Sequence, residues 1–161
     1  MRRLVLMRHA KTESHNLDGD HSRHLTKGGI QDAQDAGVAL RALGIDSALV
    51  STATRTRETF THLGLDVAPH FLDDLYFGGT DTAARLIAAT PDTTQALLVV
   101  GHAPTIPDLA ATLLFASDPS EADGVGGWFP TSAYSTFTFD GSWKDLFGDS
   151  PLGYEGTVRR H

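Results

Sequence analysis

A short apolar run near the start of the chain ends in an arginine and a histidine. Leu4, Val5, Leu6 and Met7 are consecutive large apolar residues, and the dipeptide Arg8-His9 follows them directly. Such a run is typical of a strand that is buried on both faces of a parallel sheet. Ligands of open parallel sheets bind beyond the carboxyl ends of the strands. The dipeptide alone also fits a solvated strand end, so its meaning depends on the rest of the chain.

Two later apolar runs end in the same kind of residue. The run 47–50 leads into hydroxyl residues and Arg55, and the run 96–100 leads into Gly101 and His102. Helices are predicted between the strands, over about 26–43, 54–63, 80–89 and 104–115. Because right-handed crossovers return each strand in the same direction, the carboxyl ends of these strands share one edge of the sheet. We therefore expect Arg8, His9, Arg55 and His102 to converge.

This alternation predicts an α/β fold, a three-layer α/β/α sandwich with a mainly parallel sheet. A period-two pattern over 133–139 adds an antiparallel edge strand, and Asp140-Gly141 predicts a hairpin turn into residues 143–147. The Gly- and Asp-rich segment 117–130 is predicted as a loop, and 148–161 as a loose C-terminal tail. The 161 residues contain no stretch typical of a linker, so we expect a single domain over 1–161.

Composition excludes several classes of function. A net charge of −7 argues against a protein whose main affinity is for nucleic acid, because that mode needs a basic surface. The absence of cysteine excludes disulfides, thiolate metal sites and a cysteine-based phosphatase mechanism. The start Met1-Arg2-Arg3 resembles a signal peptide only superficially, since Arg8 interrupts the apolar run. We expect a cytoplasmic monomer without membrane contact.

Two guanidinium groups and two imidazoles around one point would form an anion site that contains a nucleophile. Arginine matches phosphate oxygens through paired hydrogen bonds, and a neutral imidazole nitrogen can attack phosphorus. Histidine, with a pKa of about 6.5, is largely neutral at pH 7. The predicted chemistry is therefore phosphoryl transfer, and it needs no cofactor.

Three segments resemble the signatures of the histidine phosphatase superfamily, also called the phosphoglycerate mutase-like family. They are Arg8-His9-Ala10-Lys11-Thr12, Ser51-Thr52-Ala53-Thr54-Arg55 and Val100-Gly101-His102-Ala103-Pro104. The short length, the form of the first segment, residues 23–28 and residues 129–131 are similar to the SixA-type phosphohistidine phosphatases in particular. The resemblance covers about the first three quarters of the chain.

The resemblance implies a role for each matching residue. His9 would be the nucleophile that becomes phosphorylated, and Arg8 and Arg55 would clamp the phosphoryl oxygens. His102 would complete the pocket and stabilise the transferring group. Thr12 lies where a hydroxyl often contacts phosphate in the family, whereas we expect Arg57 to point into water.

The chain departs from the family pattern where many relatives carry an acid that protonates the leaving group. The comparable stretch, 73–79, has Tyr76-Phe77 where a glutamate is frequent, and the candidate acids Asp73, Asp74 and Asp81 fit turn or first-turn positions equally well. Without a general acid, esters are poor substrates because an alkoxide leaves badly, whereas a P–N bond demands less. This favours phosphohistidine in a protein as the substrate.

Two alternatives stay open. The protein could be a phosphatase of small phosphomonoesters, or a non-catalytic module that binds phosphate for regulation. The histidines of the polar loop, His15, His21 and His24, lack the spacing of metal ligands on a rigid element, and we expect no metal there.

Overall fold

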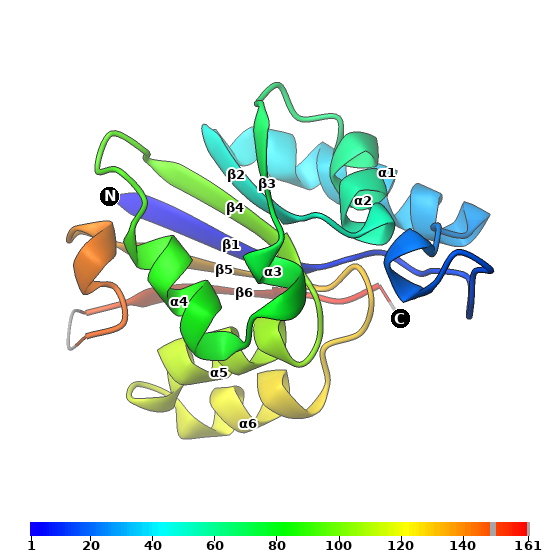
Figure 1. Ribbon diagram of the computed structural model, residues 1–161. Helices are drawn as coiled ribbons and strands as arrows, with labels where there is room; N and C mark the ends of the chain where they lie inside the picture. Colours follow the sequence, from blue (N-terminus) through cyan, green and yellow to red (C-terminus); the bar gives the residue numbers. More distant parts are fainter. Residues whose placement is uncertain (149–150, 161) are drawn as a thin grey trace.

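A six-stranded sheet runs through the molecule and separates two layers of helices (Figure 1). The computed structural model describes residues 1–148 and 151–160. The strands lie in the order β3-β2-β4-β1-β5-β6. Their bounds are β1 Arg2–Arg8, β2 Ser47–Ser51, β3 Pro69–Leu72, β4 Ala96–Gly101, β5 Tyr134–Phe139 and β6 Gly153–Val158. β1 to β4 are parallel, while β5 runs antiparallel to β1, so the predicted fold class is confirmed.

The helices cover the two faces of the sheet unequally. α1 and α2 lie on one face, and α4, α5 and α6 lie on the other, with α3 as a short turn near the end of β3 (Figure 1). Their bounds are α1 Lys27–Leu40, α2 Thr54–Leu63, α3 Asp74–Phe77, α4 Thr80–Ala88, α5 Thr105–Phe115 and α6 Pro119–Gly127. Three short 3-10 helices complete the described part of the chain, η1 Asp20–Ser22, η2 Arg41–Leu43 and η3 Trp143–Asp145.

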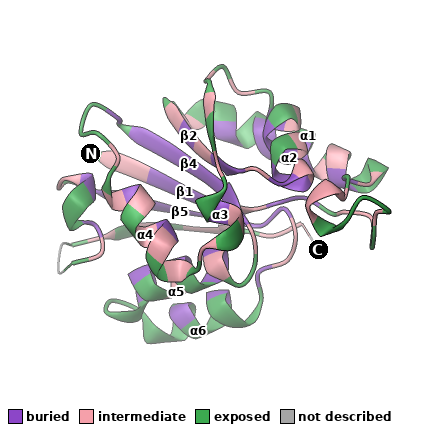
Figure 2. Ribbon diagram, viewed as in Figure 1, coloured by how far each residue is buried: buried purple, intermediate pink, exposed green. Residues whose placement is uncertain are grey.

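The two central strands, β1 and β4, are buried on both faces, as their continuous apolar sequence predicts (Figure 2). Because side chains alternate along a strand, β1 contributes to two cores. Leu4 and Leu6 pack among the helices α4, α5 and α6, and Val5 and Met7 pack among α1 and α2. Burial on both faces fixes the position of β1 in the sheet and therefore the position of Arg8 and His9 at its end.

Small residues bring α1 close to its neighbour. Thr26 caps the helix by accepting a hydrogen bond from the backbone N–H of Gly29 at 3.0 Å, as predicted. A Cβ at Gly37 would overlap the backbone of Leu63, at the end of α2. The small residue at position 37 therefore allows a close approach of α1 to α2.

Three predictions for the last third of the chain are wrong. The segment 117–130 is not a simple loop, because α6 forms within it and packs on α5 through Ala122 and Val125. Of the predicted loose tail 148–161, residues 149, 150 and 161 lie outside the described residues, and Gly153–Val158 form β6, which pairs with β5 and lies beyond it in the sheet. The predicted strand after Asp140-Gly141 is the 3-10 helix η3, whose Trp143 is fully buried.

Within the described residues, no helix is long and apolar enough to cross a membrane.

Candidate active site

The carboxyl edge of the sheet brings four basic side chains together. Arg8 is the last residue of β1 and pairs in register with Gly101 at the end of β4, so His9 and His102 leave adjacent strands side by side. Their ring centroids lie 5.4 Å apart. Arg55 reaches the same place from the first turn of α2, which follows β2. The four residues are far apart in the sequence and meet because three parallel strands end at one edge.

His9 is held with one ring nitrogen toward the backbone. Its Nδ1 lies 2.8 Å from the carbonyl oxygen of Ala10, so this nitrogen carries the proton that it donates, and Nε2 keeps its lone pair. The side chain is 6% exposed. Burial lowers the pKa of His9 to about 3, and the charges of His102, Arg55 and Arg8 act in the same direction. The ring is therefore neutral at pH 7 and presents a nucleophilic nitrogen.

His102 is fixed by a hydroxyl at the end of β2. Its Nε2 lies 2.8 Å from the Oγ of Ser51. Burial lowers the pKa of His102 to about 4, with the charge of Arg55 as the next cause. Its other ring nitrogen, Nδ1, is buried and has no hydrogen-bond partner among the described residues.

Both arginines present donors that are buried without partners. Arg8 donates from Nη1 to the carbonyl of Phe129 at 3.0 Å, while its Nε has no partner in the described part of the chain. Arg55 is 6% exposed, and its Nε is likewise unpaired with any described residue. With Nδ1 of His102, three side chains at this edge of the sheet have such an atom, and each buried polar atom left unsatisfied costs about 1–3 kcal/mol, which calls for an explanation. An anion with several acceptor oxygens supplies it.

Asp20 and Tyr76 also belong to this site, and sequence reasoning missed both. Arg55 donates from Nη2 to Oδ2 of Asp20 at 3.1 Å, and Tyr76 donates its hydroxyl to the same oxygen at 2.6 Å. The ring of Tyr76 meets that of His102 edge to face, with centroids 5.6 Å apart. Asp20 lies in the polar loop 13–23, here called the covering loop, whose lack of periodicity gave no signal for this residue.

Comparison with known proteins identifies the family. Residues 4–76 match the histidine phosphatase superfamily (branch 1). An uncharacterized protein of Mycobacterium tuberculosis is 38% identical over 144 residues, which are 87% of this chain and 91% of that protein. The chain belongs to the histidine phosphatase superfamily. It is a hydrolase of the phosphatase class, as predicted.

Solved structures agree with the assignment to the histidine phosphatases. A protein of Nakamurella multipartitia, provisionally named phosphohistidine phosphatase SixA, is 35% identical with a TM-score of 0.88, covering 98% of this chain and 95% of that one. The protein histidine phosphatase SixA in complex with tungstate shares the fold, with a TM-score of 0.78 at 22% identity, covering 97% of this chain and 96% of that one.

Thr12 and Arg57 of this histidine phosphatase form hydrogen bonds with residues outside the group of four basic residues. The hydroxyl of Thr12 accepts a hydrogen bond from Nη1 of Arg23 at 2.8 Å. Arg57 is exposed; it donates to the carbonyl of Thr52 at 2.7 Å and lies over the ring of Phe71. Thr12 therefore orders the covering loop, and Arg57 lies outside the site.

The loop histidines have separate partners. His15 lies 3.4 Å from the hydroxyl of Ser14, His21 lies 3.1 Å from that of Thr52, and His24 pairs with Glu58 at 3.0 Å. Over residues 1–148 and 151–160, no group of three or more His, Asp or Glu side chains could hold a metal ion.

The three carboxylates predicted as candidate acids lie at turns and helix starts. Asp73 precedes α3 and accepts a hydrogen bond from Thr52 at 2.6 Å, while Asp74 and Asp81 lie in the first turns of α3 and α4. Among the carboxylates of the described residues, it is Asp20 that forms an ion pair with Arg55. The hydrogen bond from Tyr76 and the charge of Arg55 lower the pKa of Asp20 to about 2, so it is ionised at pH 7.

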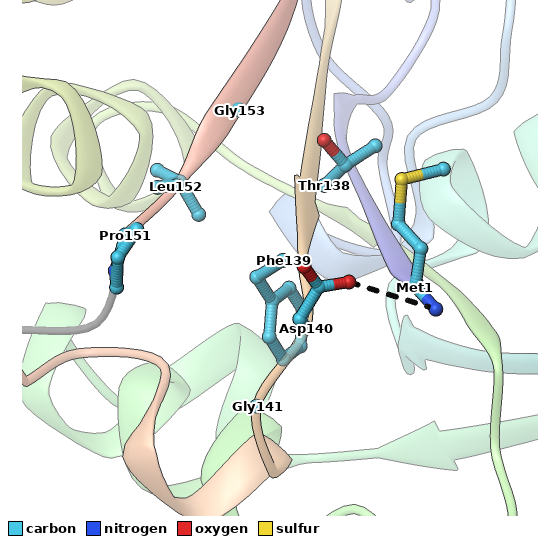
Figure 3. A pocket seen from close by; sticks show the side chains of 8 residues that line it. All are labelled: Met1, Thr138, Phe139, Asp140, Gly141, Pro151, Leu152 and Gly153. Carbon is cyan, nitrogen blue, oxygen red and sulfur yellow. Dashed lines mark ion pairs between the residues drawn. The ribbon is translucent and has the colours of Figure 1, made fainter.

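Two hollows lie at opposite ends of the sheet. One, of about 580 Å³, is lined by Met1, Asp140 and Leu152 and lies at the start of β1, away from the site (Figure 3). The other, of about 340 Å³, is lined by Arg8, Pro104 and residues 126–130. It adjoins the site and gives a substrate room beside Arg8.

Proposed function

We propose that this histidine phosphatase hydrolyses phosphohistidine carried by a protein, through a covalent phosphate on His9. One observation carries the proposal: a neutral His9 with its Nε2 lone pair free shares the carboxyl edge of the sheet with Arg8, Arg55 and His102, each of which has a buried side-chain nitrogen without a partner among the described residues. A phosphoryl group satisfies those donors and places phosphorus in front of a nucleophile.

In the first step, Nε2 of His9 forms a bond to phosphorus while the P–N bond to the substrate imidazole breaks. The other ring nitrogen of the substrate carries a proton, so the electron pair of that bond leaves with a neutral imidazole. Arg8 and Arg55 hold the phosphoryl oxygens, and His102 lies beside the transferring group and stabilises its charge. In the second step, water attacks the phosphorus of phospho-His9, the new P–N bond breaks, and Nε2 regains its electron pair as orthophosphate leaves.

The nature of the leaving group supports phosphohistidine over an ester. The carboxylate beside Arg55 belongs to Asp20, and its pKa of about 2 leaves it without a proton to donate at pH 7. An alkoxide leaves poorly without such a proton, whereas an imidazole demands less. The hollow beside Arg8 and the name of the 35%-identical Nakamurella protein also favour a phosphohistidine substrate.

A phosphoenzyme experiment tests the nucleophile. The protein is mixed with radiolabelled phosphoramidate, and we expect a phosphate on the protein that is stable to base and lost in acid. His9→Asn should abolish the label, whereas His70→Asn, which changes an exposed histidine on β3, should retain it. A label of the same yield on His9→Asn would remove His9 from this role.

A substrate comparison tests the specificity. A phosphohistidine peptide should be hydrolysed with a kcat/KM at least 100-fold above that of sugar phosphates. The reverse order would identify a phosphatase of small phosphomonoesters. Binding of vanadate without turnover of any donor would identify a non-catalytic phosphate-binding module.

A further inference from the structure

The guanidinium of Arg55 is occupied by a part of the same chain. Its Nη1 donates to the backbone carbonyl of Asp20 at 2.9 Å, and its Nη2 donates to the Asp20 carboxylate at 3.1 Å. Two of its three nitrogens therefore already face oxygen atoms of the covering loop, and only Nε is left without a described partner. An incoming phosphoryl group meets an arginine that is already paired with a carboxylate.

Asp20 is held in this place by two residues besides Arg55. Its Oδ2 accepts from the hydroxyl of Tyr76 at 2.6 Å, and its Oδ1 accepts from Nε of Arg23 at 3.0 Å. Arg23 is itself tied to the loop through the hydroxyl of Thr12 and the carbonyl of Glu13. The carboxylate is thus built into the loop, although its side chain is 56% exposed.

We infer that Asp20 competes with phosphate for Arg55 and so weakens the binding of orthophosphate, the product of the reaction. This inference rests on the proposed function, because it places the product at the same four basic residues. Two anions beside one guanidinium repel each other, and phosphate gains full access to Nη1 and Nη2 only when Asp20 withdraws. Either event reduces the affinity for the free product.

The competition would act on free phosphate more than on a protein substrate. A phosphohistidine in a protein has further contacts around the site, such as the hollow beside Arg8, to offset the repulsion. Orthophosphate has only its four oxygens. Asp20 therefore favours a large phosphorylated substrate over its small product and limits product inhibition. Since the carboxylate is ionised at pH 7, it carries its charge whenever phosphate meets Arg55 at that pH.

Calorimetric titration with orthophosphate at pH 7.5 and constant ionic strength tests the inference. Asp20→Asn removes the charge and keeps the shape, and Asp20→Ser removes it with a smaller side chain. The matched control is Asp18→Asn, in the same loop, whose carboxylate has no hydrogen-bond or ion-pair partner among the described residues. Circular dichroism and thermal unfolding verify that each variant is folded before titration.

We expect the dissociation constant for orthophosphate to fall about 10-fold or more in both Asp20 variants and to change less than 2-fold in Asp18→Asn. The product-inhibition constant should fall in parallel wherever turnover is measurable. Equal binding by the wild type, the control and the Asp20 variants would overturn this inference alone. No binding to any of them would overturn it together with the proposed phosphate site, so the two failures are distinguishable.

Discussion

The hydroxyl of Thr59 accepts a hydrogen bond from the backbone N–H of Ala10 at 3.0 Å. The same hydroxyl donates to the carbonyl of Arg55 at 2.7 Å, one turn earlier in α2. Thr59 is fully buried. One side chain thereby connects the loop that positions His9 with the helix that positions Arg55, and it sets the distance between the nucleophile and one of its guanidinium groups.

Thr59→Val should destabilise the protein by about 1–3 kcal/mol, because it leaves the buried N–H of Ala10 without an acceptor. Thr61→Val provides the control, since its exposed hydroxyl donates to the carbonyl of Arg57 within the helix. That change should shift the free energy of unfolding by less than about 0.5 kcal/mol. Urea unfolding measures both, and a smaller loss for Thr59→Val than for Thr61→Val would contradict the connecting role.

Arg55→Lys should lower kcat/KM by about 100-fold, because an ammonium cannot reproduce the fork of donors around a phosphoryl group. Arg57→Lys should change it less than about 2-fold, since Arg57 lies outside the site over Phe71. Steady-state hydrolysis of para-nitrophenyl phosphate provides the measurement. Similar losses in both variants would show that the loss does not depend on the position of Arg55 at the site.

Gly37→Ala should destabilise the protein by at least about 2 kcal/mol, because the new Cβ would overlap the backbone of Leu63 and force α1 away from α2. Gly28→Ala, near the start of the same helix, meets only the hydroxyl of Thr26 at 3.8 Å. It should stabilise the protein by about 0.5–1 kcal/mol, because alanine loses less entropy in a helix. Thermal unfolding measures both variants. A shift of the two unfolding midpoints in the same direction would contradict the predicted overlap at Gly37.

Stability should fall as the pH is lowered from about 6.5 to about 4. The pKa of His9 is lowered to about 3 and that of His102 to about 4, so over this range the unfolded chain binds two protons that the folded protein does not. Each proton contributes a slope of about 1.4 kcal/mol per pH unit. The pairing of His24 with Glu58 raises the pKa of His24 and acts in the opposite direction.

His9→Asn removes the contribution of one of these two protons to the pH dependence of stability. Urea unfolding at pH 7.5, 6.0 and 5.0 should give a shallower fall in the free energy of unfolding for His9→Asn than for the wild type. Below pH 6, the slopes of the free energy of unfolding against pH should differ between the two proteins by the contribution of about one proton. Parallel curves for the two proteins would mean that burial does not hold His9 neutral.

The sequence allowed prediction of the fold class and of the convergence of four basic residues, because both follow from strong local signals. Four consecutive large apolar residues are typical of a strand buried on both faces, and the parallel arrangement determines which strand ends meet. Leu4–Met7 and the run before His102 are of this kind. Their side chains alternate between two cores in the structure.

The elements that were missed depend on contacts distant in the sequence. α6 contains three glycines, which oppose a helix locally, and it is stabilised by packing on α5. Asp118, Pro119 and Glu121 form a helix-start pattern that would have indicated it. Asp20 and Tyr76 are brought to Arg55 by a loop and a short turn, whose paths no periodicity predicts. Side-chain pairs of this kind become visible only in three dimensions.

β6 has a consequence for solubility. Without it, β5 would be the border of the sheet, and its unpaired N–H and C=O groups would offer a template for another chain. β6 covers that template, with a hydroxyl contact of 2.5 Å between Ser135 and Thr157. It is itself a poor template, since its register with β5 shifts between Ser135 and Phe137 and Gly156 has a φ of 101°. The last strand thus protects the protein against aggregation through strand pairing.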